Sequence, residues 1–558
     1  MPLIDQIREE KLIELAKTRF SPDLLDAELK VLHDSARSED LPDPGEKAPR
    51  PVVRPDFLRW LATDPEAAQY IDSTGLRVYD VIIPGKLDLY RCHVNSILNF
   101  RRCDFQGEIN LQYAEIRGFF SVDSSLAEGI CAGGVIVHRQ FYLWRTHSEG
   151  EIRLPGADVK GILVFNGAKL KAKGDSLNAS TAKIGGSIYL IKDTERGVDF
   201  ESDGAIRLIG VEIRGDLICS GAKLKAEGRA LSTDGAKIVG SVFLNDGFDS
   251  KGEIHLCGAE IGGTLSIRGA KVANVVCHNT VVMGDMAWQR IEKSWNTTLN
   301  LIGARVKNLR DDKVSWPEEG NLDLDGLVYE ELTLHGNSSK EDIKASRYTR
   351  ELQLVAKERI DWIMLQRPER RTEPQPWMQL RDLLERKGER KQAKYVLRRF
   401  RCLQAQKSWI PWRWVKKLYA LLEEAPLRIG WSIALTLLIG TSVFTWGGSK
   451  QAMIETVRYQ PNAITDAGQV KLISPLYPKY QPFVYTLENA VPLIKLGMDE
   501  KWAPNPSPEF RQPWFPHLPW LYFVSTYGWL NFWRWALIVG GWVQATVLAA
   551  SVADRFRK

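Results

Sequence analysis

The residues best suited to chemistry are two pairs of histidine and cysteine near the middle of this 558-residue chain. His255 and Cys257 are two positions apart, so on a β-strand they would share one face. Cys277 and His278 follow 20 residues later. Imidazole nitrogen and thiolate sulphur are ligands that Zn²⁺ takes in proteins, usually four in number. The spacing makes these four residues candidate zinc ligands if the chain folds back to stack the second pair on the first.

The same residues have a second interpretation, as substitutions in a repeated sequence. His255 stands where Arg153 and Arg207 stand in two similar segments, and Cys257 stands where Pro155 and Ile209 stand. Positions on the outside of a repeat array vary in this way without any ligand. We therefore expect no bound metal, and we keep the two pairs as the candidates to examine.

Other chemistry-bearing residues show no catalytic arrangement. Cys92 and Cys103 are 11 positions apart and are most simply explained as small buried apolar residues. The adjacent acids Asp311 and Asp312 would point to opposite faces of a strand, so they would not form a catalytic pair. The sequence has no G-x-G-x-x-G, P-loop, G-x-S-x-G or H-E-x-x-H motif. We expect neither an active site nor a cofactor.

The elements that would position these residues are repeats. Residues 167–184 (GAKLKAKGDSLNASTAKI) return 54 positions later as 221–238 (GAKLKAEGRALSTDGAKI), and a third copy begins after a further 48 positions, at Gly252. Inside each copy glycines recur every 11 residues, as at Gly150 and Gly161, and apolar residues alternate with polar ones. Alternation predicts short strands. Recurring glycine predicts tight turns, and alanine after glycine predicts a crowded position. Together these features predict a β-solenoid.

Two stretches without charged residues predict membrane-spanning helices, at Ile429–Trp446 and Trp535–Ala553. Each has 18 or 19 residues, close to the ~20 that cross a bilayer. Tryptophans flank both, as expected at a membrane interface: Trp409, Trp412 and Trp414 before the first, Trp529 and Trp533 before the second. The alternative is a pair of buried helices in a soluble domain, but neither stretch has a polar face.

Positive charge is concentrated beside the first stretch. The segment Arg386–Arg428 has 13 Lys and Arg against three acids, whereas the rest of the chain has 62 basic and 66 acidic residues. This bias predicts cytoplasmic termini, two spans of a bacterial inner membrane, and attraction of anionic lipid to Arg386–Arg428. A nucleic-acid partner would not explain why these charges adjoin an apolar segment, so we do not expect one.

The connection between the two stretches contains a third apolar segment, Phe483–Ile494, which is too short to span a membrane and is interrupted by Pro492. A two-helix channel would have its pore helix here, and Glu488 would be the first candidate for a pore residue. No T-x-G-Y-G filter follows, and Ser525-Thr526-Tyr527-Gly528 is a poor substitute. We favour an interfacial helix, with Trp502, Trp514 and Trp520 nearby.

The chain resembles a bacterial family in three further segments besides the repeat G-E-I-H-L-C-G-A-E-I-G-G-T-L at 252–265: residues 57–89, 375–397 and 483–502. Members of that family combine solenoid repeats, related to pentapeptide repeats, with two C-terminal membrane helices. Some are labelled membrane-associated oxidoreductases. The resemblance implies architecture and membrane location, and it implies little about chemistry.

The predicted fold is mainly β: a parallel β-solenoid with an N-terminal helical cap, an α-helical neck and two transmembrane helices. The expected parts are N-terminal helices and a proline-rich linker at 1–50, the solenoid at 51–338, a neck with one tetratricopeptide-like hairpin around Gly388 at 339–408, an interfacial and first spanning helix at 409–446, an external connection at 447–529, and a second span with a basic tail at 530–558. We expect an inner-membrane scaffold that binds an unidentified cytoplasmic protein. A homo-oligomeric membrane effector or channel is the alternative, and an oxidoreductase is a third.

Overall fold

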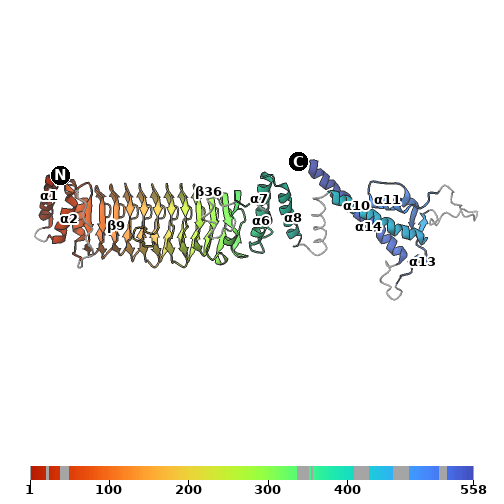
Figure 1. Cartoon of the computed structure of the whole chain (residues 1–558), viewed down its shortest axis with the longest axis horizontal. Helices are drawn as coiled ribbons and strands as arrows, with labels where there is room; N and C mark the ends of the chain where they lie inside the picture. The colour runs from red at the N-terminus through yellow and green to blue at the C-terminus, as the bar shows by residue number, and fades with distance from the viewer. Residues whose placement is uncertain are drawn as a thin grey trace, which may run out of the picture. The chain divides into compact units, whose positions relative to one another are not determined.

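The computed structural model describes residues 2–20, 24–37, 50–335, 351–352, 356–406, 426–456, 477–514 and 525–556. The chain forms two compact units, Met1–Val396 and Leu397–Lys558, which are described separately. Within the first unit the strands stack into a parallel solenoid, with α1 and α2 at one end and α6 and α7 at the other (Figure 1). A β-solenoid with helices on either side of it was expected from the sequence.

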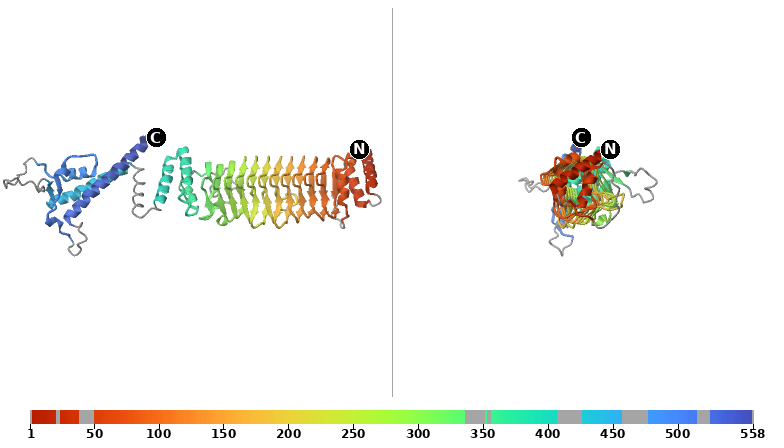
Figure 2. Two further views of the ribbon diagram at one scale, coloured as in Figure 1. Left: turned by 180° about the vertical axis from the view of Figure 1, so that it is seen from behind. Right: turned by 90° about the vertical axis from the view of Figure 1, so that its left-hand side faces the viewer.

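The N-terminal end of the solenoid is covered by helices α1 (Pro2–Phe20), α2 (Asp26–Ala36), α3 (Pro55–Thr63) and α4 (Ala67–Tyr70). The end-on view in Figure 2 shows these helices lying across the stacked coils. Ser35 of α2 accepts hydrogen bonds from the backbone N–H groups of Asp72 (2.9 Å) and Arg77 (3.2 Å), next to strand β1 (Leu76–Tyr79). The cap thus satisfies backbone donors that the first coil would otherwise leave unpaired.

Each solenoid coil contains four short strands. One coil consists of β5 (Leu98–Arg101), β6 (Asp104–Phe105), β7 (Ile109–Asn110) and β8 (Glu115–Ile116), each paired in parallel with its counterpart in the next coil. The sheet from β3 (Leu87–Asp88) to β39 (Leu322–Asp323) has 11 strands, one for each of 11 coils.

The register explains the period seen in the sequence. Leu163 pairs with Ile188 and Ile188 pairs with Leu217, so the 54-residue repeat is two coils. Elsewhere a coil is shorter: Leu76 pairs with Leu98 and Leu98 with Phe120, at steps of 22 residues. The 11-residue spacing of glycines is therefore half a coil.

The corners of the coils depend on small residues. In the Gly-Ala pairs, the glycine has positive φ, as at Gly156 (+65°) and Gly258 (+65°), and the following Ala157 and Ala259 are buried. The first coils use other residues at such corners, including Arg91 (φ +55°), for which the left-handed region is costly. The corners thus turn the backbone while leaving room for the interior of stacked Ile, Leu, Val and Phe side chains.

The solenoid ends on an antiparallel strand rather than on an open edge. Strand β40 (Val328–His335) pairs with β41 (Glu351–Leu352), and α6 (Ala356–Met364) follows. The sequence pattern predicts helix over 339–366, but 351–352 forms a strand because pairing satisfies the free edge of the last coil. The hairpin around Gly388 (φ +80°) is built from α7 (Pro374–Arg386) and α8 (Arg390–Gln406).

The second unit contains α10 (Pro426–Ser449), β42 (Met453–Glu455), α11 (Pro482–Ala490), α12 (Met498–Lys501), β43 (Trp502–Pro504), α13 (Pro508–Arg511) and α14 (Thr526–Phe556). Among the described residues, one helix is long and apolar enough to cross a membrane, at Gly430–Ser449 in α10. The sequence pattern predicts two such helices; the second predicted segment lies within α14. Trp409, Trp412, Trp414 and Trp520 lie outside the described residues.

Candidate functional site

The solenoid wall brings two of the four candidate metal ligands together with a residue that the sequence did not single out. His255 and Cys257 follow strand β31 (Glu253–His255), and Asp234 follows β27 (Arg229–Ser232) in the preceding coil. One ligand atom from each of Asp234, His255 and Cys257 lies within 4.8 Å of the other two. Strand register produces this meeting because Ser232 pairs with His255, which places Asp234 beside Cys257.

The second histidine–cysteine pair divides between wall and interior. His255 pairs with Val276, so Cys277 takes the interior position of Leu256 and His278 takes the wall position of Cys257. Cys277 is 1% exposed, and burial raises its pKa to about 12. It therefore lies among apolar residues and away from the group on the wall. His278 Nε2 is buried and has no hydrogen-bond partner among the described residues.

Two neighbours orient the group on the wall. Glu253 Oε2 lies 2.8 Å from His255 Nε2, and the backbone N–H of Cys257 donates to Asp234 Oδ1 at 2.9 Å. Burial and the adjacent Asp234 carboxylate raise the pKa of the Cys257 thiol. The paired acids have separate structural roles: Asp311 bonds Arg359, and Asp312 accepts from the backbone N–H of Ser315 at 2.9 Å.

Glu488 holds a loop of the second unit together. Its carboxylate accepts backbone hydrogen bonds from Leu496 (3.1 Å), Gly497 (2.9 Å), Met498 (2.7 Å) and Asp499 (2.9 Å). Asp499 in turn contacts Arg534 of α14 at 2.6 Å. Pro492 is half-buried and lies between the end of α11 and this loop. Glu488 is thus fully engaged in fixing the chain between α11 and α12.

Helix α11 is packed against both long helices. Tyr485 of α11 contacts Phe444 of α10, with ring centroids 4.8 Å apart. A Cβ atom on Gly440 of α10 would lie 2.5 Å from Thr486, and one on Gly541 of α14 would lie 1.9 Å from the Ala490 carbonyl oxygen. Two glycines therefore make room for this short helix. The sequence predicted the helix but gave no signal for its partners, because glycine is common in apolar helices anyway.

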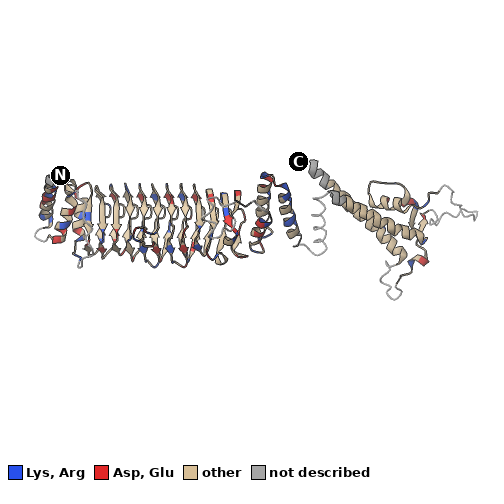
Figure 3. Ribbon diagram, viewed as in Figure 1, with Lys and Arg blue, Asp and Glu red and all other residues tan. Residues whose placement is uncertain are grey.

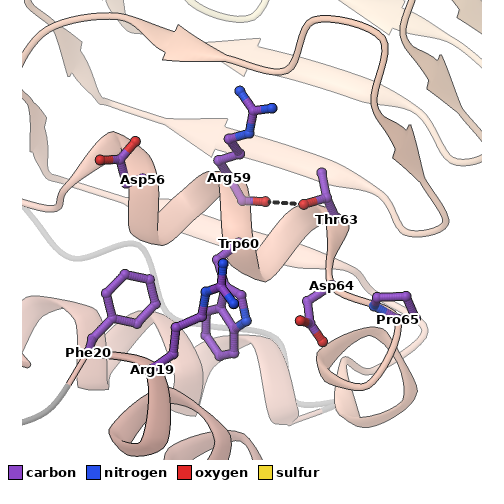
Figure 4. A pocket seen from close by; sticks show the side chains of 8 residues that line it. All are labelled: Arg19, Phe20, Asp56, Arg59, Trp60, Thr63, Asp64 and Pro65. Atoms are coloured by element: carbon purple, nitrogen blue, oxygen red, sulfur yellow. Dashed lines mark hydrogen bonds between the residues drawn. The ribbon is translucent and has the colours of Figure 1, made fainter.

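A cavity of about 390 Å³ lies in the N-terminal cap between α1 and α3 (Figure 4). Its lining includes Arg19 and Arg59 but also Asp56 and Asp64, so the charges balance. Arg59 donates to the Asp88 carbonyl at 2.8 Å, and Asp64 accepts from the backbone N–H of Ala67 at 3.0 Å. With these groups already paired, the cavity selects no particular ligand.

The outer wall of the solenoid alternates in charge from coil to coil. On one face Asp158 pairs with Lys183, Lys183 with Glu212, and Glu212 with Lys237. On another face the sequence is Lys169, Glu201, Lys223, Asp249 and Lys271. Figure 3 shows acidic and basic residues interspersed along the coils, whereas α10 has few of either. The wall is therefore polar and close to neutral, unlike a surface for nucleic acid.

Comparison with known proteins finds no match, whether with family models, with curated proteins or with solved structures.

Proposed function

We propose that this chain is a scaffold without catalytic activity, anchored in a bacterial inner membrane, whose solenoid wall binds a cytoplasmic protein. The observation that carries the proposal is the unburied apolar surface of α10. Only 17% of its most apolar window is buried, and Trp431 and Leu438 are 77% and 66% exposed. A core helix of a soluble protein would bury these side chains, so their surroundings must be lipid or another apolar surface.

A second span in α14 completes the proposed anchor. Trp535, Val539 and Trp542 are 65%, 60% and 59% exposed. Gln544 of α14 donates a 2.9 Å hydrogen bond to Thr436 of α10, a type of polar contact that joins helices inside membranes. The two helices would thus cross as an antiparallel hairpin with α11 packed against it.

Orientation follows from the basic residues in Arg386–Arg428, of which 407–425 lie outside the described residues. Lys and Arg are enriched on the cytoplasmic side of membrane proteins, so this segment and the solenoid would face the cytoplasm. The same charges would hold anionic lipid at ~1 kcal/mol per residue near the surface. This topology matches the resemblance to two-span solenoid proteins.

The near-neutral wall supports a protein partner rather than a nucleic acid. Stacked coils offer regularly spaced polar side chains over a long surface, which is how solenoids bind proteins. No residue group in the described chain has the geometry of an active site, and the proposal assigns none.

The test is membrane retention and photo-crosslinking of the full chain in cells. Leu438→Arg should release the protein from carbonate-washed membranes, whereas the matched Leu438→Phe should not. A crosslinker at exposed wall position Lys183 should capture one discrete cytoplasmic protein, and one at Asp64 in the cap should not capture it. Retention of the Leu438→Arg variant would refute the anchor, and wall crosslinks to copies of the chain alone would refute the scaffold.

A membrane effector or channel is a second candidate, favoured by the position of α11 between α10 and α14. Conductance in proteoliposomes that disappears in Glu488→Ala, with the variant still folded in detergent, would establish it. The oxidoreductase label found in the resembling family is a third. Flavin absorbance in the purified protein, or a spectral change on adding NAD(P)H, would be required to support it.

A further inference from the structure

Three side chains with different metal-binding atoms converge on the solenoid wall, independently of any scaffold role. Asp234 offers a carboxylate, His255 an imidazole and Cys257 a thiol, with one atom of each within 4.8 Å of the others. The His255 side chain is 10% exposed, and Cys257 is half-buried. Mixed oxygen, nitrogen and sulphur donors suit Zn²⁺, whereas Mg²⁺ and Ca²⁺ prefer oxygen alone.

A fourth donor stands in the next coil. The Gly258 N–H donates to the His278 carbonyl at 2.7 Å, so His278 is stacked directly on Cys257. Its Nε2 is buried without a hydrogen-bond partner among the described residues. An unpaired buried polar atom costs about 1–3 kcal/mol, which binding to a metal would offset.

The neighbours of the three ligands resemble the support that metal sites require. Glu253 contacts Nε2 of His255, which leaves Nδ1 as the nitrogen available to a metal. Asp234 is held by the Cys257 N–H and by the Ser232 hydroxyl, which donates to Oδ2 at 3.1 Å. Arg229 lies 3.9 Å from the same oxygen, so the carboxylate keeps one cationic neighbour at its exposed side.

We propose that Asp234, His255 and Cys257, with His278 as the fourth ligand, bind one divalent ion of the zinc class. Zinc ligands lie ~2.0–2.3 Å from the ion, so side-chain rotation must bring these atoms closer together. The ion would join three successive coils at one corner of the solenoid. Cys277, although adjacent in sequence, takes no part because it faces the interior.

The test uses the full chain in detergent, purified without a polyhistidine tag and stripped with a chelator. Titration with Zn²⁺ against a chromogenic chelator should give one ion per chain. Co²⁺ should give a thiolate-to-cobalt charge-transfer band, which Cys257→Ser abolishes and Asp234→Asn retains. Each of Asp234→Asn, Cys257→Ser and His278→Gln should weaken Zn²⁺ binding about 10-fold or more.

The matched control is Cys92→Ser, which removes another half-buried free thiol and should leave binding unchanged. Thermal unfolding of each metal-free variant shows whether it is folded, and Zn²⁺ should raise the midpoint of the unaltered chain only. Binding that survives Cys257→Ser and His278→Gln, or that Cys92→Ser reduces equally, would show an adventitious ion only. Absence of stoichiometric binding would overturn the proposal outright.

Discussion

The guanidinium of Arg359 is buried against the carboxylate of Asp311, with two N–O distances of 2.6 Å. Their side chains are 1% and 3% exposed, and Trp316 Nε1 donates to the same carboxylate at 2.9 Å. Arg359 belongs to α6 and Asp311 to β38 (Arg305–Asp312), so this pair fastens the neck to the last coils.

Breaking this pair should destabilise the protein strongly. Arg359→Met leaves a buried carboxylate unpaired, and we expect a loss of about 3–5 kcal/mol in the free energy of unfolding. Lys313→Ala is the matched control, because its exposed pair with Glu358 joins the same region to α6 at 2.6 Å and should cost under ~1 kcal/mol. Denaturant unfolding measures both, and equal effects would contradict the role given to Arg359.

Neighbouring glycines of α14 should respond differently to substitution. Gly541→Ala would place a Cβ 1.9 Å from the Ala490 carbonyl oxygen and so displace α11, whereas Gly540→Ala meets no atom within 4 Å. We expect Gly541→Ala to increase protease cleavage near α11 in detergent-solubilised protein and Gly540→Ala to have no effect. Identical cleavage patterns would mean that α11 is not seated there.

The alternating wall charges should make the number of removed coils matter. Deleting 167–220 removes two coils and keeps Asp158 beside Lys237, by the 54-residue repeat. Deleting 183–211 removes one coil and places Asp158 beside Glu212 and Lys169 beside Lys223. Although longer, the second variant should have the lower unfolding temperature, and added salt should narrow the difference because it screens exposed charges. A salt-independent difference would count against this explanation.

His147 should make stability fall in mild acid. Burial lowers its pKa below the ordinary value of 6.5 because the charged imidazolium is penalised. Below that value the unfolded chain binds the proton more readily, so stability declines as pH falls toward the folded pKa. The unfolding temperature should therefore drop less between about pH 7.5 and pH 5.5 in His147→Gln than in the unaltered chain. An unchanged drop would assign the effect to other groups.

Period and corner chemistry made the solenoid predictable. Glycine at positive φ followed by buried alanine, as at Gly156 and Ala157, is a local requirement that the sequence displays directly. The group around Cys257 was only half visible, because Asp234 precedes it by 23 residues and joins it through strand register. Which side of the wall Cys277 takes also depends on that register. The seat of α11 depends on two helices whose glycines have no distinguishing spacing.

The corners also differ between the two ends of the solenoid. Between residues 80 and 145, left-handed corners fall on Asp80, Arg91, Arg102, Tyr113, Ser124 and Arg145, with φ between 50° and 56°. Later coils place glycine at most such corners. Each non-glycine corner carries roughly 1 kcal/mol of strain, so the first coils are intrinsically the least stable. In a linear array, opening starts where local stability is lowest, so amide exchange should begin in these coils. The N-terminal helices then act as a latch that sets the rate at which the array unravels.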